Sequence, residues 1–360
     1  MNFPTHFISS GLFLKIHSKF TLLVSWFFLV WGPGSVYAEP QDPRAVCDTQ
    51  SIMATAWTIC LWDEKHSAAE LQEAIADGME KVREIDRWMS EWKPQSLVSQ
   101  INDNAGIQAV KVSDDLWELL QLSLLHSRLT DGAFDISFNA FFGKYSWKKG
   151  SERFPTDSEI RKTLPLVNYK NIELNEKEKS VFLRKPGMRI GFGGVGQGWA
   201  VDEVVKVLQG KAISAGFVDG SGDTYFWGRK PGRKLFTVGI GDPRGKGVLF
   251  KIYDTDFAVT TAGDTEHFFM RNGKRFHHII DPHTGHSASN SAQVTVICKR
   301  ARLCDVADDG IFVLGPEKGK AYAEKIGVEA VIVSPQRKVT LTKGLTSFTS
   351  PWGPALKVNF

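Results

Sequence analysis

The 360-residue sequence has no internal repeat, no low-complexity segment and no linker rich in proline and serine. It therefore gives no indication of a repeat architecture or of domains joined by a tether. Charge is nearly balanced, with 44 Lys and Arg against 40 Asp and Glu. Nothing in that balance favours a nucleic-acid-binding protein. A single compact body of helices and strands is the organisation that remains.

Cysteine is scarce, with only Cys47, Cys60, Cys298 and Cys304. Their spacings match no zinc-binding pattern. In an exported protein the local disulfide pairings are Cys47 with Cys60 and Cys298 with Cys304, and two other pairings are allowed. Two disulfides, free buried thiols and a mixture of the two all stay open.

Long apolar runs are missing except for Phe20 to Trp31, which is too short to span a membrane. Lys15 and Lys19 precede this run, and Gly32-Pro33-Gly34 and Val36-Tyr37-Ala38 follow it. A cationic start, an apolar segment and a small last residue are typical of a secretory signal peptide. We expect residues 1–38 to be that peptide, and an uncleaved N-terminal anchor is the alternative.

Cleavage after residue 38 leaves one domain, residues 39–360, which is large enough to bury a substantial core. The removed segment contains two lysines and no acidic residue, so 42 of the 44 basic residues and all 40 acidic ones remain. No Leu-rich segment ends directly at a cysteine, which argues against a lipoprotein signal. We expect an exported, periplasmic protein that meets a membrane only indirectly and binds no nucleic acid.

Two amphipathic helices are predicted in the first half of this domain. Ser67 and Glu70 form a capping box ahead of apolar residues that recur every three or four positions up to Met89. This helix should end in an exposed aromatic loop. A second helix is expected from Ser113 to about Leu129, with acidic residues in its first turn.

The second half is predicted to be richer in strands. Residues 149–165 are polar and indicate a surface loop with a short helix. Strand patterns occur at Ile172–Leu174, Ser180–Arg184 and Arg189–Phe192. Helix patterns occur at Trp199–Leu208, Asp305–Leu314 and Glu317–Ile326.

The most informative stretch runs from Phe276 to Gly285 and reads Phe-His-His-Ile-Ile-Asp-Pro-His-Thr-Gly. The paired isoleucines predict a short strand that enters the core and leaves it at a turn. His278 and Asp281 then lie near a strand end, where His can act as acid or base and Asp can orient it or bind a cation. An Asp-Pro turn with solvated histidines explains the same stretch.

A glycine loop is predicted between a strand at 189–192 and the helix that begins near Trp199. Its bare glycines let backbone amides approach a phosphate at the positive end of that helix. It is neither a Walker loop nor the dinucleotide fingerprint. Close packing of strand against helix explains the glycines equally well. The turns at 218–223 and 260–264 are similar: each is either a tight bend or a place that holds a ligand.

Asp305 and Asp309 stand four residues apart at the start of an expected helix and therefore share one face. Two carboxylates on one face suit a hard cation such as Mg²⁺. A solvated acidic helix start is the alternative.

Together these elements resemble the ApbE family, the FAD:protein FMN transferases. The resemblance covers the chain from about Met53 to about Ala330 in one consistent order, and His-x-x-Asp-Pro-x-Thr-Gly at 278–285 is its most specific motif. The other segments that carry it are Met89-Ser90, Ser96–Asn102, Gly132–Ser137, Gly193–Asp202, Gly220–Asp223, Thr261–Asp264 and Asp305–Gly315.

The resemblance implies an α+β fold: a single compact ApbE-like domain, similar to the T-fold, with mixed or antiparallel sheets flanked by helices. It also implies that the chain binds FAD as a substrate together with Mg²⁺. The enzyme would cleave FAD and attach FMN by a phosphoester to a Thr or Ser of an acceptor protein.

The same resemblance implies roles for individual residues. His278 and Asp281 are the candidate catalytic residues: His278 is the candidate base, and Asp281 is the alternative for the proton chemistry. The cation would lie at Asp305 and Asp309, with the backbone carbonyl of Gly196. The flavin-binding positions, of which the first two belong to a covering loop, would be Met89, Trp92, Asp135, Gly193, Gly194, Gly198, Asp202, Gly222, Asp223, Thr261 and Gly263.

The chain departs from the family pattern at the site itself. Asp309 replaces a hydroxyl and adds negative charge, while Gln197 replaces a lysine and removes a phosphate-facing charge. The other departures are Gly191 for Asp, Gly196 for Ala, Ala262 for Ser and Trp92 for Tyr. Two alternative functions therefore stay open: a flavin-binding or delivery protein without transferase activity, and an FAD pyrophosphatase that releases FMN and AMP.

Overall fold

The computed structural model describes residues 37–38, 44–232, 234–350 and 353–358. All of them belong to one unit, Gly32–Phe360. Residues 1–36 of the predicted signal peptide lie outside the described part of the chain. Within that part, no helix has both the length and the apolar character that a membrane crossing requires.

The predicted helices are present, several with bounds close to those expected. The first helix carries the predicted capping box, in which Ser67 and Glu70 each accept a backbone hydrogen bond from the other. The helices in the described residues are α1 (Ala68–Met89), α2 (Leu97–Asp103), α3 (Asp114–Leu129), α4 (Asp157–Thr163), α5 (Gly196–Gly210) and α6 (Ala301–Ile326), with 3-10 turns at Ile136–Phe141, Leu164–Leu166 and Tyr169–Asn171.

The largest sheet has eight strands in the order β18-β17-β16-β11-β8-β7-β3-β2, and every neighbouring pair is antiparallel. Its strands are β2 (Val46–Ile52), β3 (Thr55–Trp62), β7 (Ala215–Gly220), β8 (Asp223–Trp227), β11 (Phe257–Gly263), β16 (Gln293–Cys298), β17 (Glu329–Val333) and β18 (Val339–Leu341).

A second, five-stranded sheet has the order β1-β9-β10-β20-β19 and contains one parallel pair, β10 with β20. Its strands are β1 (Tyr37–Ala38), β9 (Phe236–Gly241), β10 (Val248–Asp254), β19 (Leu345–Ser350) and β20 (Gly353–Val358). The smaller sheets are β4-β6-β5 (Val110–Lys111, Ser180–Leu183, Ile172–Asn175), β12-β13 (Phe268–Arg271, Lys274–His277) and β14-β15 (Ile280–Asp281, His286–Ser287).

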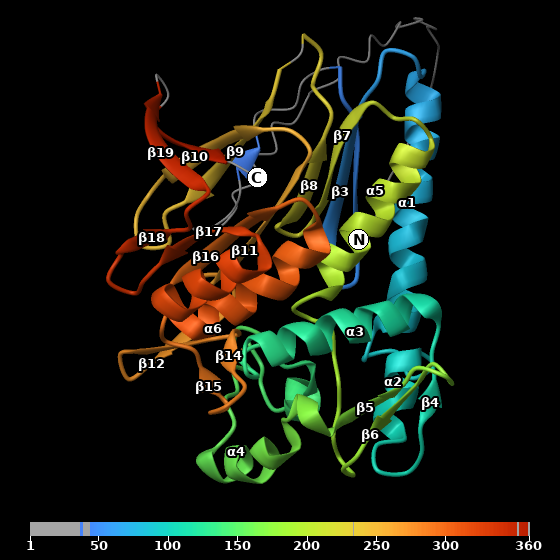
Figure 1. Ribbon diagram of the computed structural model, residues 1–360, viewed down its shortest axis with the longest axis vertical. Coiled ribbons are helices and arrows are strands. Elements are labelled where there is room, and N and C mark those ends of the chain that lie inside the picture. Colours follow the sequence, from blue (N-terminus) through green and yellow to red (C-terminus); the bar gives the residue numbers. More distant parts are fainter. Residues whose placement is uncertain (1–36, 39–43, 233, 351–352, 359–360) are drawn as a thin grey trace, which may run out of the picture. The chain divides into compact units, whose positions relative to one another are not determined.

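Two hydrophobic cores lie on the two faces of the eight-stranded sheet. Helices α1, α5 and α6 pack on one face, where Trp57 and Trp199 are almost fully buried (Figure 1). On the other face, Phe226 and Phe257 of this sheet pack with Phe236 of the five-stranded sheet. The predicted α+β class with mixed sheets flanked by helices is therefore confirmed.

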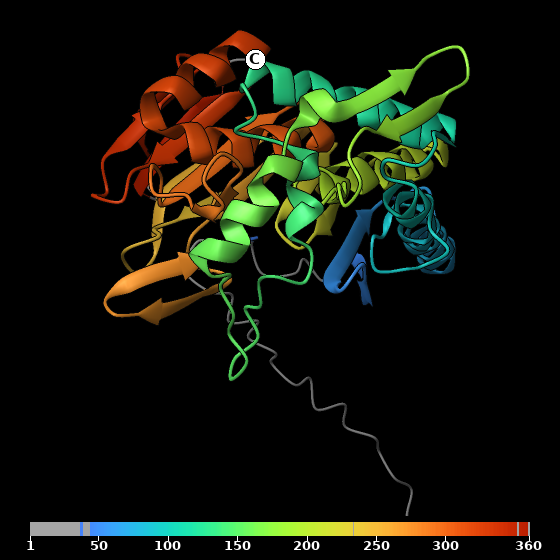
Figure 2. The ribbon, with the colours of Figure 1, turned by 90° about the horizontal axis from the view of Figure 1, so that it is seen from below.

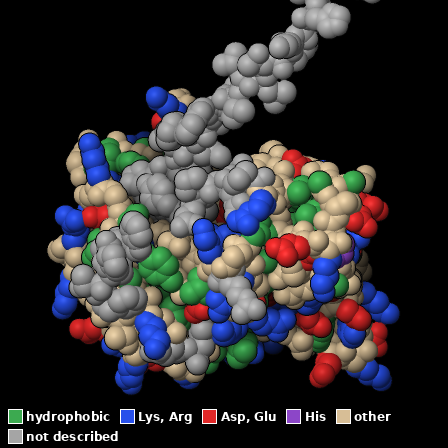
Figure 3. Space-filling view, turned by 90° about the horizontal axis from the view of Figure 1, so that it is seen from above, with side chains coloured by type: hydrophobic (Ala, Val, Ile, Leu, Met, Phe, Trp, Pro, Cys, Tyr) green, Lys and Arg blue, Asp and Glu red, His purple; other side chains and the backbone are tan. Residues whose placement is uncertain are grey.

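The surface seen in Figure 3 carries basic and acidic side chains interspersed. This arrangement agrees with the near balance of charge in the sequence.

The strand predicted at Arg189–Phe192 is wrong, because the segment joins no sheet. Side-chain amides take the place of a neighbouring strand. The N–H of Ile190 donates to Oδ1 of Asn102 at 2.7 Å, and the carbonyl of Ile190 accepts from Nδ2 of Asn102 and of Asn139. These contacts hold the chain extended just ahead of the glycine loop.

The two helices predicted at 305–314 and 317–326 are present as the two parts of α6 on either side of a kink, and the first begins four residues earlier than expected. Gly315 lies at the kink with a φ of 78°, and Pro316 follows it. Disulfides join Cys47 to Cys60 and Cys298 to Cys304. Of the open cysteine arrangements, the structure has two local disulfides, as is common in proteins that fold in an oxidising compartment.

Candidate active site at the start of helices α5 and α6

The glycine loop leads directly into α5, whose first turn lies against α6. The N–H of Gly198 donates to Oδ2 of Asp305 at 2.7 Å. A Cβ on Gly198 would stand 2.5 Å from the carbonyl oxygen of Ala301 and 2.6 Å from Cβ of Asp305. Only glycine permits this approach. Two of the predicted site residues are therefore in direct contact.

Asp202 connects the same two helices one turn further along α5. Its Oδ1 accepts from the N–H of Ala301 at 2.8 Å, and its Oδ2 accepts from Nε of Arg302 at 2.7 Å. The Arg302 guanidinium lies over the Trp199 ring at 3.9 Å. Asp202 thus supplies the capping acceptor that Arg300, the N-cap residue of α6, does not provide. In this structure it positions α6, and its contact with a cofactor stays a prediction.

Four carboxyl groups gather between α6 and β8. Asp305, Asp308 and Asp309 come from α6, and Asp223 begins β8. Burial raises the pKa of Asp305 to about 8 and that of Asp309 to about 6, and the charge of Asp309 adds to the shift at Asp305. Burial and then the neighbouring carboxylates also raise the pKa values of Asp223 and Asp308. A positive charge bound among these carboxyl groups would therefore stabilise their ionised forms.

Sequence reasoning did not single out Asp308. It stands three residues after Asp305, so a helical spacing argument applied beyond the pair at 305 and 309 would have included it. Its side chain lies near the hydroxyl of Thr260, which is fully buried.

This set of oxygen donors fits a hard divalent cation, because a cation would relieve the repulsion between buried carboxylates. Within the described residues, no three His, Cys, Asp or Glu side chains form a complete metal site. Mg²⁺ at nucleotide sites is commonly held by one or two carboxylates, with substrate phosphates and water completing its shell. A protein cage of three or more side chains is therefore not required here.

The glycine loop lies close to this cluster. A Cβ on Gly194 would stand 2.5 Å from Oδ2 of Asp309, and one on Gly196 would stand 2.5 Å from Sδ of Met89. At Gly193, in contrast, no described atom lies within 4 Å of a Cβ position. The loop thus has one side against α6 and α1 and one open side.

The predicted aromatic loop after α1 is present and exposed. Met89 is buried, whereas 71% of the Trp92 surface is accessible. The Trp92 ring lies 4.3 Å from that of Phe142, and the guanidinium of Arg189 lies 4.8 Å from the same Phe142 ring. Trp92 is therefore an aromatic surface supported from one side. Its predicted role in covering a flavin stays a prediction.

His277 and His278 have different surroundings. His277 is buried, with Nε2 at 2.8 Å from the carbonyl of Ala288 and its ring against Phe312 of α6. His278 lies between β13 and β14, half-buried and edge-on to His267. Its Nδ1 has no hydrogen-bond partner among the described residues. Burial and then the neighbouring histidines lower the pKa of His278 to about 3, so its imidazole is neutral.

The carboxylate of Asp281 faces His283. Its Oδ1 accepts from the N–H of His283 at 2.9 Å and lies 3.0 Å from Nδ1, while Nε2 of His283 lies 2.9 Å from the carbonyl of Asp131. Burial alone would lower the pKa of His283, but the Asp131 carbonyl and the Asp281 carboxylate raise it overall. Sequence reasoning overlooked this residue, because its link to Asp131 exists only in the folded chain.

Two more of the predicted residues, Asp135 and Gly222, lie at turns with defined contacts. Asp135 accepts from the N–H and hydroxyl of Ser137 and from the N–H of Tyr169. The N–H of Gly222 donates to Asp219 at the turn that places Asp223 in the carboxyl cluster.

The turn predicted at 260–264 is wrong for most of its length, because Thr260 to Gly263 belong to strand β11 and pair with β16. In this strand, Oγ1 of Thr261 lies 3.0 Å from Oγ1 of Thr295. Gly263 is buried, and a Cβ there would stand 3.8 Å from Oγ1 of Thr265, an ordinary van der Waals contact. Its contact with a cofactor stays a prediction.

A profile of the ApbE family matches residues 53–332. The chain belongs to the ApbE family. Among its relatives, the FAD:protein FMN transferase of Treponema pallidum is 28% identical over 300 residues, which cover 78% of this chain and 82% of that one. The enzyme of the same name from Escherichia coli strain K12 is 27% identical, with 78% and 82% covered.

Solved ApbE structures share the fold. The ApbE protein of Thermotoga maritima matches with a TM-score of 0.77 at 28% identity, covering 83% of this chain and 97% of that one. The flavinyl transferase ApbE of Pseudomonas stutzeri matches with a TM-score of 0.73 at 24% identity, covering 84% of this chain and 97% of that one. At this identity the match supports only the fold. The predicted ApbE membership and its fold are confirmed.

Proposed function

We propose that this ApbE protein is an exported, Mg²⁺-dependent FAD:protein FMN transferase. The observation that carries the proposal is the contact of Gly198 with Asp305, which places the amide-rich start of α5 beside a cluster of buried carboxyls. Backbone amides at a helix start bind phosphate, and the carboxyls can bind a cation on the same phosphate. The relatives named above carry the same activity in their names.

The proposed reaction is phosphoryl transfer to a hydroxyl group. The acceptor's Thr or Ser oxygen forms a bond to the FMN phosphorus, and the bond from that phosphorus to the AMP oxygen breaks, so that AMP leaves with the electron pair. Mg²⁺, when bound at Asp305 and Asp309 with the carbonyl of Gly196, would neutralise charge on the phosphates. The start of α5 holds the pyrophosphate, and the open Gly193 admits it.

His278 accepts the proton of the acceptor hydroxyl in this proposal. A base must be unprotonated and must have a nitrogen that is not already bonded. The His278 ring is neutral, and its buried Nδ1 has no hydrogen-bond partner among the described residues. Its low pKa makes it a weak base. Phosphate charge arriving nearby would favour the protonated ring and raise that pKa. Asp281 acts through His283 to hold the turn that carries His278.

One contact favours the second candidate, a protein that binds FAD without transferring FMN. Nε2 of Gln197, at the position of the family lysine, lies 3.5 Å from Oγ1 of Thr55 on β3, at the limit of a hydrogen bond. The amide of Gln197 is neutral, so it offers no positive charge to a phosphate where the family has a lysine. The two disulfides support the exported part of the proposal, because such bonds persist in oxidising compartments.

The test uses residues 39–360 with FAD, Mg²⁺ and a periplasmic extract of the source cell as the supply of acceptors. A flavin-fluorescent protein band on a denaturing gel, with AMP released, supports transferase activity. Free FMN and AMP without a band indicate a pyrophosphatase, and unchanged FAD indicates a binding protein. Either of the last two results would overturn the proposed function.

A further inference from the structure

A second polar site lies on the hairpin β12–β13, outside the cluster at α5 and α6. The hairpin turns at Asn272-Gly273, whose φ values of 51° and 72° are those of a two-residue hairpin turn. Its Phe269 and Phe276 rings stack on each other at 5.3 Å. The loop that ends at Phe154 packs against this pair, because Trp147 contacts Phe269 and Phe154 contacts Phe276. The ribbon shows the hairpin in orange next to the green helix α4, which follows this loop (Figure 2).

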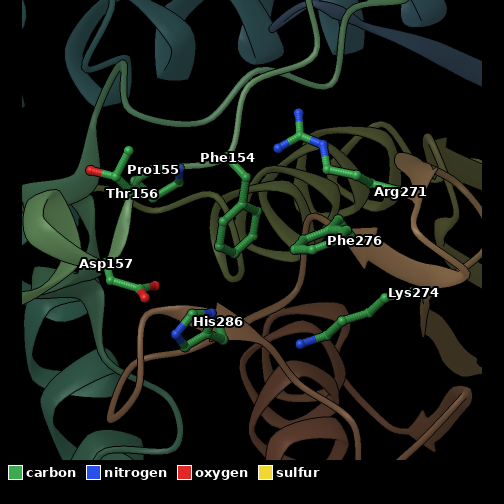
Figure 4. A pocket seen from close by; sticks show the side chains of 8 residues that line it. All are labelled: Phe154, Pro155, Thr156, Asp157, Arg271, Lys274, Phe276 and His286. Atoms are coloured by element: carbon green, nitrogen blue, oxygen red, sulfur yellow. The ribbon is translucent and has the colours of Figure 1, made fainter.

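A pocket of about 330 Å³ opens between this hairpin and the start of α4 (Figure 4), and we call it the hairpin pocket. It is lined by Phe154, Pro155, Thr156, Asp157, Arg271, Lys274, Phe276 and His286. Arg271 and Lys274 lie on one side, and Asp157 lies across from them. The walls are therefore aromatic, and one side is cationic.

The two cations of the hairpin pocket are held over aromatic rings. The Arg271 guanidinium lies 5.4 Å from the Phe269 ring, and Nζ of Lys274 lies 5.5 Å from the Phe276 ring. Both side chains are exposed, and neither has an ion-pair partner within the part of the chain that the structure describes. By contrast, the neighbouring Arg275 is bound to Asp264. The nearest acidic groups are Glu152, whose pKa is lowered by backbone hydrogen bonds and also by the charge of Arg271, and Asp157 on the opposite wall. Among the lining residues the two cations outnumber the single carboxylate.

The hairpin pocket is connected to the proposed catalytic motif. Strand β13 ends at His277, so His278 is the next residue along the chain. His286 of the pocket stands opposite Asp281 in the β14–β15 register. A partner bound in this pocket would therefore be held beside the residue that is proposed to receive the acceptor's proton.

We propose that the hairpin pocket binds an acidic side chain of the acceptor protein, in a segment next to the Thr or Ser that receives FMN. This inference rests on the proposed function, since it names the partner of that reaction. Charge complementarity carries it: two cations over aromatic faces attract a carboxylate to the hairpin side of the pocket, and the single opposing carboxylate, Asp157, lies on the far side. At 330 Å³ the pocket lies at the small end of ligand sites and suits one or two side chains better than a dinucleotide.

The first test measures peptide binding with residues 39–360. The probe is a fluorescein-labelled peptide of alternating Glu and Ser that ends in Thr, and its control has Gln at every Glu. Fluorescence anisotropy at low salt should give tighter binding of the acidic peptide. The double variant Arg271→Glu/Lys274→Glu should weaken that binding about 3- to 30-fold, as expected for the loss of two exposed ion pairs. Arg271→Gln/Lys274→Gln should lie between the two.

A matched control carries the same charge change elsewhere. Lys318 and Lys325 are exposed on the C-terminal half of α6, and Lys318→Glu/Lys325→Glu should leave peptide affinity within about twofold if the effect is local rather than one of net charge. Equal weakening in both double variants, or no preference for the acidic peptide, would overturn the proposal.

Two further measurements, FAD titration and vesicle binding, distinguish a failure of the acidic-segment proposal from a failure of the proposed function. Titration of FAD should give the same affinity in the wild type and the hairpin variant. If no protein binds FAD while the peptide preference persists, the proposed function fails and the acidic-segment site stands. If the wild type binds phosphatidylglycerol vesicles through Arg271 and Lys274 and ignores the acidic peptide, the surface is a membrane contact and the proposal is wrong.

Discussion

The backbone N–H of Gly198 and the carboxylate of Asp305 meet at 2.7 Å although 107 positions separate them in the sequence. Asp305 is thereby tied to the glycine loop as well as to its own helix. The two motifs that the family resemblance joined by order alone are joined in the fold by this hydrogen bond.

Gly198→Ala should damage both stability and FAD binding. Its Cβ would overlap the Ala301 carbonyl and Asp305, so we expect a loss of about 1–3 kcal/mol in the free energy of unfolding. Gly193→Ala is the control for stability alone, because its Cβ would meet no described atom. Urea unfolding and FAD titration of both variants measure this. Equal stability of the two variants would show that the close contact does not matter.

Asp305→Asn should change how stability depends on pH. Asp305 has a pKa of about 8 in the folded chain against 3.8 ordinarily, so the folded state binds an extra proton between these values. Metal-free wild type should therefore lose stability as pH rises from 4 to 8. The Asn variant should lose less and melt higher than wild type at pH 8 without Mg²⁺.

Thermal melts at pH 5 and pH 8, with and without Mg²⁺, measure this. Mg²⁺ should raise the melting temperature of the wild type and have little effect on the variant. Parallel pH curves for both proteins, or an equal response to Mg²⁺, would count against the cation site.

His278→Ala and His277→Ala should separate catalysis from stability. Loss of a general base costs about 10²–10⁴-fold in rate, so single-turnover transfer should fall by that factor in His278→Ala while FAD affinity changes little. His277→Ala removes a buried ring bonded to Ala288 and should instead lower stability by about 1–3 kcal/mol. Near-normal transfer by a folded His278→Ala protein would remove His278 from the mechanism.

The disulfide Cys298–Cys304 should matter for the cation site, because it joins the end of β16 to the residue before Asp305. Replacing both cysteines by Ser should cost about 2 kcal/mol of stability and weaken Mg²⁺ binding. The same change at Cys47 and Cys60, which join the neighbouring strands β2 and β3, should lower stability and leave Mg²⁺ affinity unchanged. Calorimetric Mg²⁺ titration of both double variants distinguishes these outcomes, and equal Mg²⁺ affinity in the two would contradict a special role for Cys298–Cys304.

The sequence patterns predicted correctly those helices that are determined by residues close together in the sequence. The capping box at Ser67 and the apolar periodicity up to Met89 specify α1 because the helix buries one face. The strand at Arg189–Phe192 was wrongly predicted because Asn102 and Asn139, distant in sequence, bind the Ile190 backbone.

The site divides in the same way. Asp305 and Asp309 could be found from helical spacing and family motifs. The involvement of Asp308 depends on burial against β8 and β11, and that of His283 depends on the Asp131 carbonyl. These contacts arise only when distant segments pack together.

The most direct test of the account is intact-mass spectrometry of the acceptor protein after incubation with FAD, Mg²⁺ and residues 39–360. The account predicts that the acceptor gains the mass of one FMN phosphoester while an equal amount of AMP appears, and that replacing the acceptor's Thr or Ser abolishes the gain. AMP without a mass change on any protein, or FAD left intact, would contradict it.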